Sequence, residues 1–133
     1  MSTRTPIGLL DTSVVIALST LSEQDLPTIS TISSITLAEL SVGPLVTTDI
    51  RERQRRQLVL QTAETTFDPL PFDSACARRF GVIASELRAS GRTSRARGLD
   101  ALIAATALTH ELPLFTRNVR DFAGITGLDV RAV

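Results

Sequence analysis

The amino-acid sequence predicts a single α/β domain of three α/β/α layers, with a central parallel sheet between two layers of helices. Short apolar segments of strand length alternate with longer segments in which apolar residues recur at helical spacing, and this alternation favours parallel strands joined by helices. The 133 residues contain no linker or internal repeat, so we expect one domain over residues 1–133. The sequence also lacks the roughly 18 consecutive apolar residues of a membrane span.

The first part of the chain predicts two strands, each followed by a helix. Residues 7–10 are apolar and short, as a buried strand is, and residues 11–18 provide three helix-capping side chains followed by an apolar helical stretch. Residues 28–33 alternate polar and apolar side chains with the period of a strand. Ser34 is then predicted to cap a helix over residues 35–42, which the following Gly-Pro pair ends.

The middle of the chain predicts two helices separated by a weak strand. Residues 49–62 are polar and rich in arginine, and they predict an exposed helix. Residues 67–72 have strand character interrupted by two prolines. Asp73 is predicted to cap the next helix and Gly91 to end it. Within that helix the apolar residues fall on one inward face: Cys76, Phe80, Ile83 and Leu87.

The last third of the chain predicts a helix over residues 95–111, strands over 114–116 and 128–130, and a helical turn over 118–122 between them. In a parallel sheet flanked by helices, ligands bind beyond the carboxyl ends of the strands. Polar residues that directly follow a strand are therefore candidate site residues.

The composition excludes several classes of mechanism. Fourteen basic and fourteen acidic residues give a formal net charge of zero, so there is no general sign of nucleic-acid binding. Every basic residue is arginine, which excludes a lysine nucleophile or phosphate-binding lysine. The single histidine, His110, excludes a paired-histidine ribonuclease. The single cysteine, Cys76, cannot form an internal disulfide, so we expect it in the core of a cytoplasmic protein.

Two acidic residues lie in apolar helical segments. Asp100 lies within residues 99–108 and Glu39 within residues 35–42, and the helical neighbours of both are largely apolar. A buried carboxylate without a partner costs several kcal/mol, so each is expected to have a cation or strong hydrogen-bond donors nearby. Because lysine is absent, the candidate cations are an arginine or a metal ion.

Two further acids, Asp11 and Asp121, follow predicted strands and are expected in the same crevice as Glu39 and Asp100. Four carboxylates repel one another, and such an oxygen-only ligand set suits Mg²⁺ or Mn²⁺. An ion of this kind activates water for attack on phosphorus, which predicts phosphodiester chemistry. Polar residues nearby are expected to orient the carboxylates and water through hydrogen bonds: Thr12, Ser13, Thr116 and Asn118.

Each acid also has an ordinary structural interpretation. Asp11 is well placed to cap a helix, and Asp121 to be a solvated turn residue. Glu39 and Asp100 could instead pair with buried arginines, in which case their role would be structural.

Four segments carry these acids in order: residues 10–13, 36–40, 97–107 and 116–122. Together they span nearly the whole chain and resemble the PIN-domain nucleases, among them the VapC-type toxins of bacterial toxin–antitoxin pairs. The resemblance implies a PIN-like α/β/α fold, RNA cleavage that depends on Mg²⁺ or Mn²⁺, a homodimer, and a cognate antitoxin that blocks the active site. It matches Asp11, Glu39, Asp100 and Asp121 to the family's acidic quartet, of which the fourth acid is the least constant.

Arginines near the predicted acidic site are candidate RNA contacts, with a solvated loop as the ordinary alternative. They are Arg92, Arg95, Arg97 and Arg117. Tryptophan and tyrosine are absent, so recognition should depend on RNA shape and backbone charge. For the protein as a whole, the alternative is a non-catalytic PIN-like module that binds RNA or protein. Such a module would have no need of four mutually repelling acids.

Overall fold

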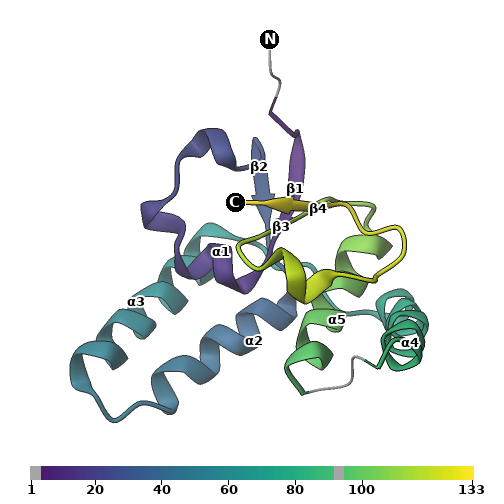
Figure 1. Ribbon diagram of the computed structural model, residues 1–133. Helices are drawn as coiled ribbons and strands as arrows, with labels where there is room; N and C mark the ends of the chain where they lie inside the picture. Colours follow the sequence, from purple (N-terminus) through teal and green to yellow (C-terminus); the bar gives the residue numbers. More distant parts are fainter. Residues whose placement is uncertain (1–3, 92–94) are drawn as a thin grey trace.

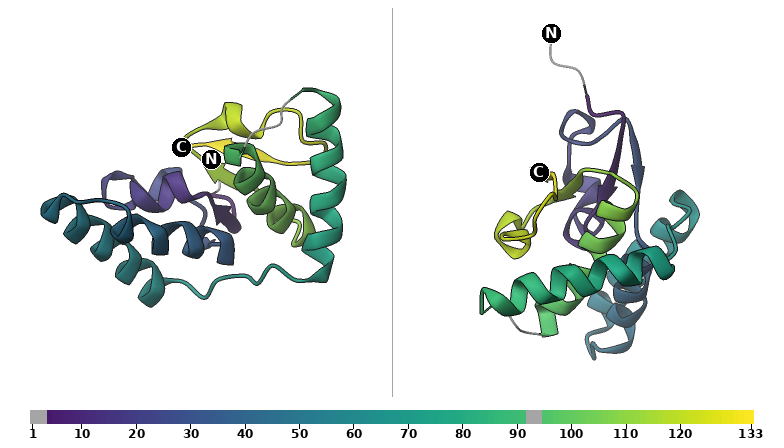
Figure 2. Two further views of the ribbon diagram at one scale, coloured as in Figure 1. Left: turned by 90° about the horizontal axis from the view of Figure 1, so that it is seen from below. Right: turned by 90° about the vertical axis from the view of Figure 1, so that its right-hand side faces the viewer.

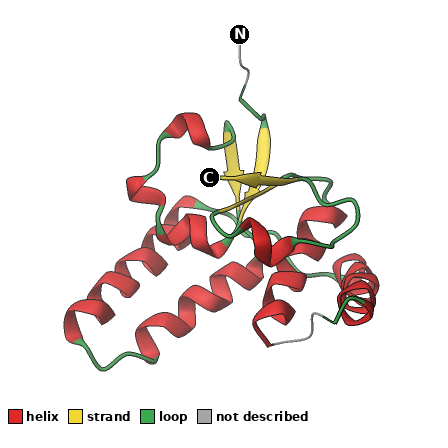
Figure 3. Cartoon of the chain, in the orientation of Figure 1, coloured by secondary structure: helices red, strands yellow, loops and turns green. Residues whose placement is uncertain are grey.

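The computed structural model describes residues 4–91 and 95–133, apart from the side chains of residues 95 and 96. In this part of the chain, strands alternate with helices (Figures 1 and 3). The strands are β1 (Ile7–Leu10), β2 (Ile29–Thr31), β3 (Leu114–Thr116) and β4 (Val130–Ala132). The α-helices are α1 (Thr12–Ile16), α2 (Ser34–Val42), α3 (Ile50–Thr66), α4 (Ser74–Ala89) and α5 (Arg95–Thr109). The short 3-10 helices are η1 (Leu18–Thr20), η2 (Glu23–Asp25), η3 (Gly43–Leu45) and η4 (Val119–Phe122).

The four strands form one sheet in the order β2-β1-β3-β4, and each neighbouring pair is parallel. At its centre, Leu9 of β1 pairs with Leu114 of β3, and Leu10 pairs with Phe115. This confirms the predicted parallel sheet. Because β1 and β3 are parallel neighbours, the segments that follow them leave the sheet at the same edge.

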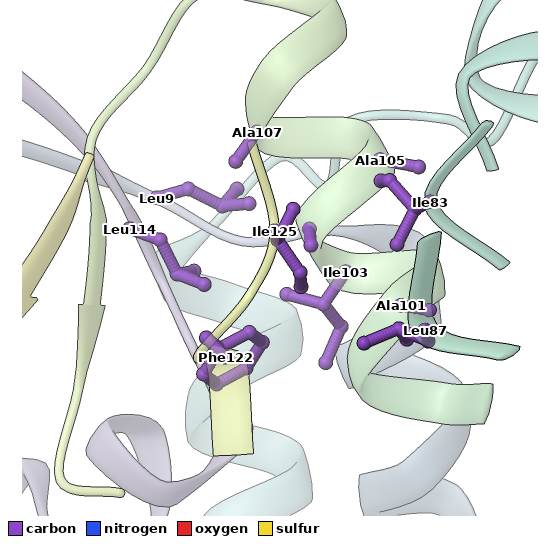
Figure 4. Packing of buried hydrophobic residues seen from close by; sticks show 11 residues of the cluster. Leu9, Ile83, Leu87, Ala101, Ile103, Ala105, Ala107, Leu114, Phe122 and Ile125 are labelled. Carbon is purple, nitrogen blue, oxygen red and sulfur yellow. The ribbon is translucent and has the colours of Figure 1, made fainter. Parts of the chain in front are cut away.

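Alternate residues of the central strands enter two separate cores. Leu9 and Leu114 belong to a cluster with residues of α4 and α5, whereas Leu10 and Phe115 belong to a cluster with residues of α1, α2 and α3. Figure 4 shows the first cluster, which joins the sheet to α4, α5 and η4. Figure 2 shows α4 and the α2–α3 pair on opposite sides of the molecule. The predicted three-layer architecture is therefore confirmed.

Helix α5 runs through the first core. Its fully buried residues are Ala101, Ile103, Ala104, Ala105, Thr106 and Ala107. Helix α4 packs against it with the face predicted from the sequence, on which Cys76, Ile83 and Leu87 are buried and Phe80 is partly buried. Asp100 immediately precedes the buried run of α5, so its carboxylate emerges beside the core.

Helices α2 and α3 lie side by side and extend away from the sheet (Figure 1). Arg56 of α3 links the two helices, because its guanidinium donates to the carbonyl of Gly43, the residue after α2, at 2.9 Å. It also donates to Glu52 within α3 at 2.9 Å. Glu52 and Arg56 form an ion pair at the i,i+4 spacing of a helix. At the far end of this hairpin, Leu45, Val46 and Ile50 are exposed.

Several predictions of local structure were wrong. Ser33 rather than Ser34 caps α2, because its Oγ accepts the Thr36 N–H at 3.1 Å. Residues 67–72 form no strand, since the two prolines leave a single parallel bridge between Leu70 and Ser33. The last strand covers Val130–Ala132 instead of residues 128–130, because it pairs in register with β3. Among the helices of the described residues, none is long and apolar enough to span a membrane.

Candidate active site

Four distant segments bring their acidic side chains to the carboxyl ends of β1 and β3. Asp11 directly follows β1, Asp121 lies in η4 after β3, and the helices α2 and α5 carry Glu39 and Asp100. The charges of Asp11, Asp121 and Glu39 all raise the pKa of Asp100. The other three carboxylates are therefore close enough to Asp100 to disfavour its negative charge.

Asp11 is held by hydroxyl groups and does not cap a helix with its side chain. It is 5% exposed, and although it precedes α1 its carboxylate accepts no capping hydrogen bond. Instead, the hydroxyls of Ser13 and Thr116 each donate to Oδ2 at 2.8 Å. Those hydroxyls in turn accept the backbone N–H groups of Arg117 and Asn118, at 3.2 and 3.0 Å. Within the described residues no donor reaches Oδ1, which is thus left for another ligand.

The contact of Asn118 with this network comes from its backbone N–H group. From the sequence, the residue type had made its side chain the candidate for such a contact. The Asn118 side chain is exposed. Its N–H group, together with that of Arg117, fixes the direction in which the Thr116 and Ser13 hydroxyls donate to Asp11.

Glu39 accepts one hydrogen bond, from the hydroxyl of Thr12 to Oε1 at 2.8 Å. Its pKa is raised above the ordinary value chiefly by burial and further by the charge of Asp11, while the Thr12 bond acts in the opposite direction. Thr12 itself is buried. Thr12 was predicted to orient a carboxylate through a hydrogen bond, and it contacts the carboxylate of Glu39 directly.

Asp100 has neither an ion pair nor a hydrogen bond to its carboxylate from the described residues. Burial, followed by the charges of Asp11, Asp121 and Glu39, raises its pKa to about 7, and the charge of Arg97 opposes this only in part. The alternative of a buried arginine partner is thus not found in the part of the chain that the structure describes. A half-buried carboxylate with three like charges nearby is an unfavourable arrangement unless a cation joins it.

Asp121 differs from the other acids because it is paired and more exposed. Its Oδ1 accepts from Arg97 at 3.2 Å, and its side chain is 41% exposed. Arg97, a candidate RNA contact, is thereby placed against the acidic site. Of the other candidates, Arg117 has an exposed side chain, whereas Arg92 and the side chain of Arg95 lie outside the described residues.

The donor set fits a hard cation of the Mg²⁺ or Mn²⁺ type, because all four groups offer carboxylate oxygens. Within residues 4–91 and 95–133, no three aspartate, glutamate, histidine or cysteine side chains already lie close enough together to share one ion. Mutual repulsion keeps unneutralised carboxylates apart, and Mg²⁺ is commonly bound through one or two protein carboxylates with water completing the shell. The Oδ1 atom of Asp11 and the carboxylate of Asp100 fit this mode of binding.

A groove begins at this site and continues between α1, α2 and α3. It has a volume of about 520 Å³. Thr12 and Glu39 line it, together with Arg55, Arg56, Glu52 and the apolar residues Ile16, Leu40, Leu58 and Val59. Ile16 and Leu58 are more than half exposed, so large apolar side chains stand open to solvent beside the acidic groups.

Comparison with known protein families gives a match over most of the chain. A model of the PIN domain matches residues 8–128. The chain belongs to the PIN-domain family. Among named relatives of this PIN domain, Ribonuclease VapC5 of Mycobacterium tuberculosis is 40% identical, covering 96% of this chain and 93% of its own length. Ribonuclease VapC1 of Rickettsia felis is 32% identical over 94% of this chain and 95% of its own.

Solved structures of VapBC proteins superpose well on the chain. VapBC-5 of Mycobacterium tuberculosis, a toxin–antitoxin complex, aligns with a TM-score of 0.79 and 35% identity over 96% of this chain and 97% of that one. VapBC2 of Rickettsia felis, bound to a DNA fragment from its promoter, aligns with a TM-score of 0.76 and 25% identity over 96% of this chain and 98% of that one. The fold and the family are thus shown together.

Two buried hydroxyl residues near Glu39 were not predicted from the sequence. Thr36 and Ser33 are fully buried, and Thr36 contacts the Thr12 hydroxyl. Ser33, Thr36 and Glu39 are spaced three residues apart, which places them along one side of α2. That spacing was the available signal, and assigning the helix cap to Ser34 concealed it.

Proposed function

We propose that the protein is a metal-dependent endoribonuclease and the toxin of a VapBC-type pair. The observation that carries the proposal is that four distant segments bring carboxylates to the carboxyl ends of β1 and β3, where one of them, Asp100, has neither an ion pair nor a hydrogen bond to its carboxylate within the described residues. Membership of the PIN-domain family and the ribonucleases among its relatives support the choice of RNA as substrate.

Asp11, Glu39, Asp100 and Asp121 are proposed to hold Mg²⁺ or Mn²⁺, which when bound would activate water and neutralise charge on the phosphodiester. Asp11 would present Oδ1, because Ser13 and Thr116 occupy Oδ2. Thr12 would keep Glu39 in place through its hydrogen bond. Asp121 would give up its contact with Arg97 and bind the ion instead. Arg97 would then be placed to face the negatively charged backbone of RNA.

The test of this proposal is cleavage of total cellular RNA by the purified protein, free of any antitoxin. With Mg²⁺ or Mn²⁺ we expect discrete RNA fragments on a gel, and with EDTA we expect none, because the proposed ion is what activates the attacking water. If folded protein with saturating Mn²⁺ leaves all RNA classes intact, the non-catalytic PIN-like module becomes the better hypothesis.

We further propose that the chain forms a homodimer, acts in the cytoplasm, and has a cognate antitoxin that covers the groove. The solved relatives are toxin–antitoxin complexes, which supports a partner of this class. The groove is lined by Glu39 and by exposed apolar side chains, so an occupant that buries Ile16 and Leu58 would also cover Glu39.

Leu58→Arg should therefore weaken binding of the antitoxin by about 10- to 100-fold, because a charge replaces an apolar contact in the groove. Surface plasmon resonance with the cognate antitoxin measures the effect. Val82→Arg is the matched control, since Val82 is a similarly exposed apolar residue on α4, outside the groove. Equal affinities of the two variants would place the antitoxin on another surface.

A further inference from the structure

We propose that Ser33 and Thr36 are positioning residues that hold Glu39 in place through Thr12. The inference rests on the proposed function, because it concerns the carboxylate that would bind the metal ion. Neither residue touches Glu39 directly. They belong to a line of buried hydroxyl groups that starts at the cap of α2, passes to α1 and ends at the carboxylate.

The hydrogen bonds of this line become shorter toward the carboxylate. The Oγ of Ser33 lies 3.4 Å from Oγ1 of Thr36, and that atom lies 3.0 Å from Oγ1 of Thr12. The last bond, from Thr12 to Oε1 of Glu39, is 2.8 Å long. Ser33 and Thr36 are fully buried and Thr12 nearly so, so water does not compete for these groups.

Thr12 is the donor in both of its bonds in the line. A hydroxyl has one hydrogen, and an ionised carboxylate only accepts. The single hydrogen of Thr12 is therefore shared between Oγ1 of Thr36 and Oε1 of Glu39, both of which accept from it. Oγ1 of Thr36 also accepts from the hydroxyl of Ser33. The Ser33 oxygen, finally, accepts the backbone N–H of Thr36.

These two acceptors restrict the rotation of the Thr12 hydroxyl. Because Oγ1 of Thr36 and Oε1 of Glu39 both accept its hydrogen, the hydroxyl stays oriented between them. The line also connects α1 to the first turns of α2, so Glu39 is held relative to Asp11, the residue before α1. A hydroxyl three bonds away thus contributes to the geometry of the metal ligands.

The experiment is a double-mutant cycle with the affinity for Mn²⁺ as its readout, measured by electron paramagnetic resonance on the full chain without antitoxin. Thr36→Val keeps the shape of the side chain and the helix cap but removes the hydroxyl. We expect this variant to bind Mn²⁺ about 3- to 10-fold more weakly than the wild type. This effect is smaller than that of losing a group bonded directly to a metal ligand. Thr36→Ser should restore the affinity to within about twofold. In the Thr12→Val background, Thr36→Val should have no further effect, because the line is already cut.

Thr106→Val is the matched control. Thr106 is also a fully buried threonine in a helix, but its hydroxyl donates to the Leu102 carbonyl at 3.1 Å and has no link to a carboxylate. Its Mn²⁺ affinity should equal that of the wild type. If Thr36→Val does not fold, Thr36→Ala removes the same hydroxyl without adding a methyl group and takes its place.

The inference is overturned if Thr36→Val binds Mn²⁺ as Thr106→Val does, or if it weakens binding equally with and without Thr12. Absence of Mn²⁺ binding by the wild type would overturn it as well. The proposed function fails differently: a wild type that binds Mn²⁺ but cleaves no RNA leaves the hydroxyl line intact and excludes the nuclease.

Discussion

Asp11→Asn is expected to lower the rate of RNA cleavage in Mn²⁺ by about 10²- to 10³-fold, an effect typical of removing a charged or polar group next to a reacting centre. Two donors, Ser13 and Thr116, converge on Oδ2 of Asp11. In the variant they would select the orientation in which the amide oxygen replaces Oδ2, since an NH₂ group cannot accept their hydrogens. The NH₂ group would then replace Oδ1 and direct hydrogens at the proposed metal position.

If the hydroxyls reversed to accept from the NH₂ group, the hydrogen of each would lose its present acceptor on residue 11. Each already accepts a backbone N–H, from Arg117 and Asn118. The substitution therefore removes a charge and also places a donor where a ligand oxygen is needed. Asp68→Asn is the control, because Asp68 is exposed between α3 and α4 and far along the chain from the acidic segments. Cleavage by Asp11→Asn at more than about a tenth of the wild-type rate would exclude Asp11 from the site.

The acids themselves could be predicted from the sequence because their surroundings conflict with their charge. Asp100 precedes a run of small apolar residues, and the structure buries that run in the core between the sheet and α4. The strands followed by acids were also visible, because β1 and β3 are short apolar segments. The parallel topology of the sheet brings Asp11 and Asp121 to the same edge, and the alternation of strands and helices in the sequence predicts that topology.

The partners of the acids could not be predicted in the same way. Both Ser33 and Ser34 suit a helix cap, and only the register of the bridge between Ser33 and Leu70 selects the first. The contact between Thr12 and Thr36 joins residues that are 24 positions apart, and no local pattern specifies it. Arg97 was likewise proposed for RNA from local charge, whereas its pairing with Asp121 depends on where η4 lies.

Asp100→Asn should raise the free energy of unfolding by about 1–2 kcal/mol at pH 8 in EDTA, and the melting temperature by about 3–8 °C. Burial and the neighbouring acids raise the pKa of Asp100 to about 7. Full conversion of that shift would give about 4 kcal/mol, and the smaller figure allows for the solvent that reaches this half-buried group. Thermal unfolding of wild type, Asp100→Asn and the exposed control Asp68→Asn measures the effect.

The raised pKa of Asp100 determines how the stability of the wild type changes with pH. In the unfolded chain Asp100 loses its proton near pH 4, whereas in the folded protein it keeps the proton until about pH 7. Between these values the folded state binds more protons, so the wild type loses stability as pH rises through this window and reaches its lowest value above it. Asp100→Asn lacks this titration, so its advantage should shrink as pH falls from 8 to 5.

Addition of Mn²⁺ should reverse the order of the two proteins. The wild type gains stability because the ion binds the folded state alone, and Asp100→Asn gains less because it has lost a ligand charge. A structural role for Asp100 predicts the opposite result in EDTA: a carboxylate paired with a buried arginine would make Asp100→Asn less stable by about 3–5 kcal/mol. The sign of one difference in melting temperature therefore distinguishes a metal ligand from a salt bridge, without any measurement of RNA cleavage.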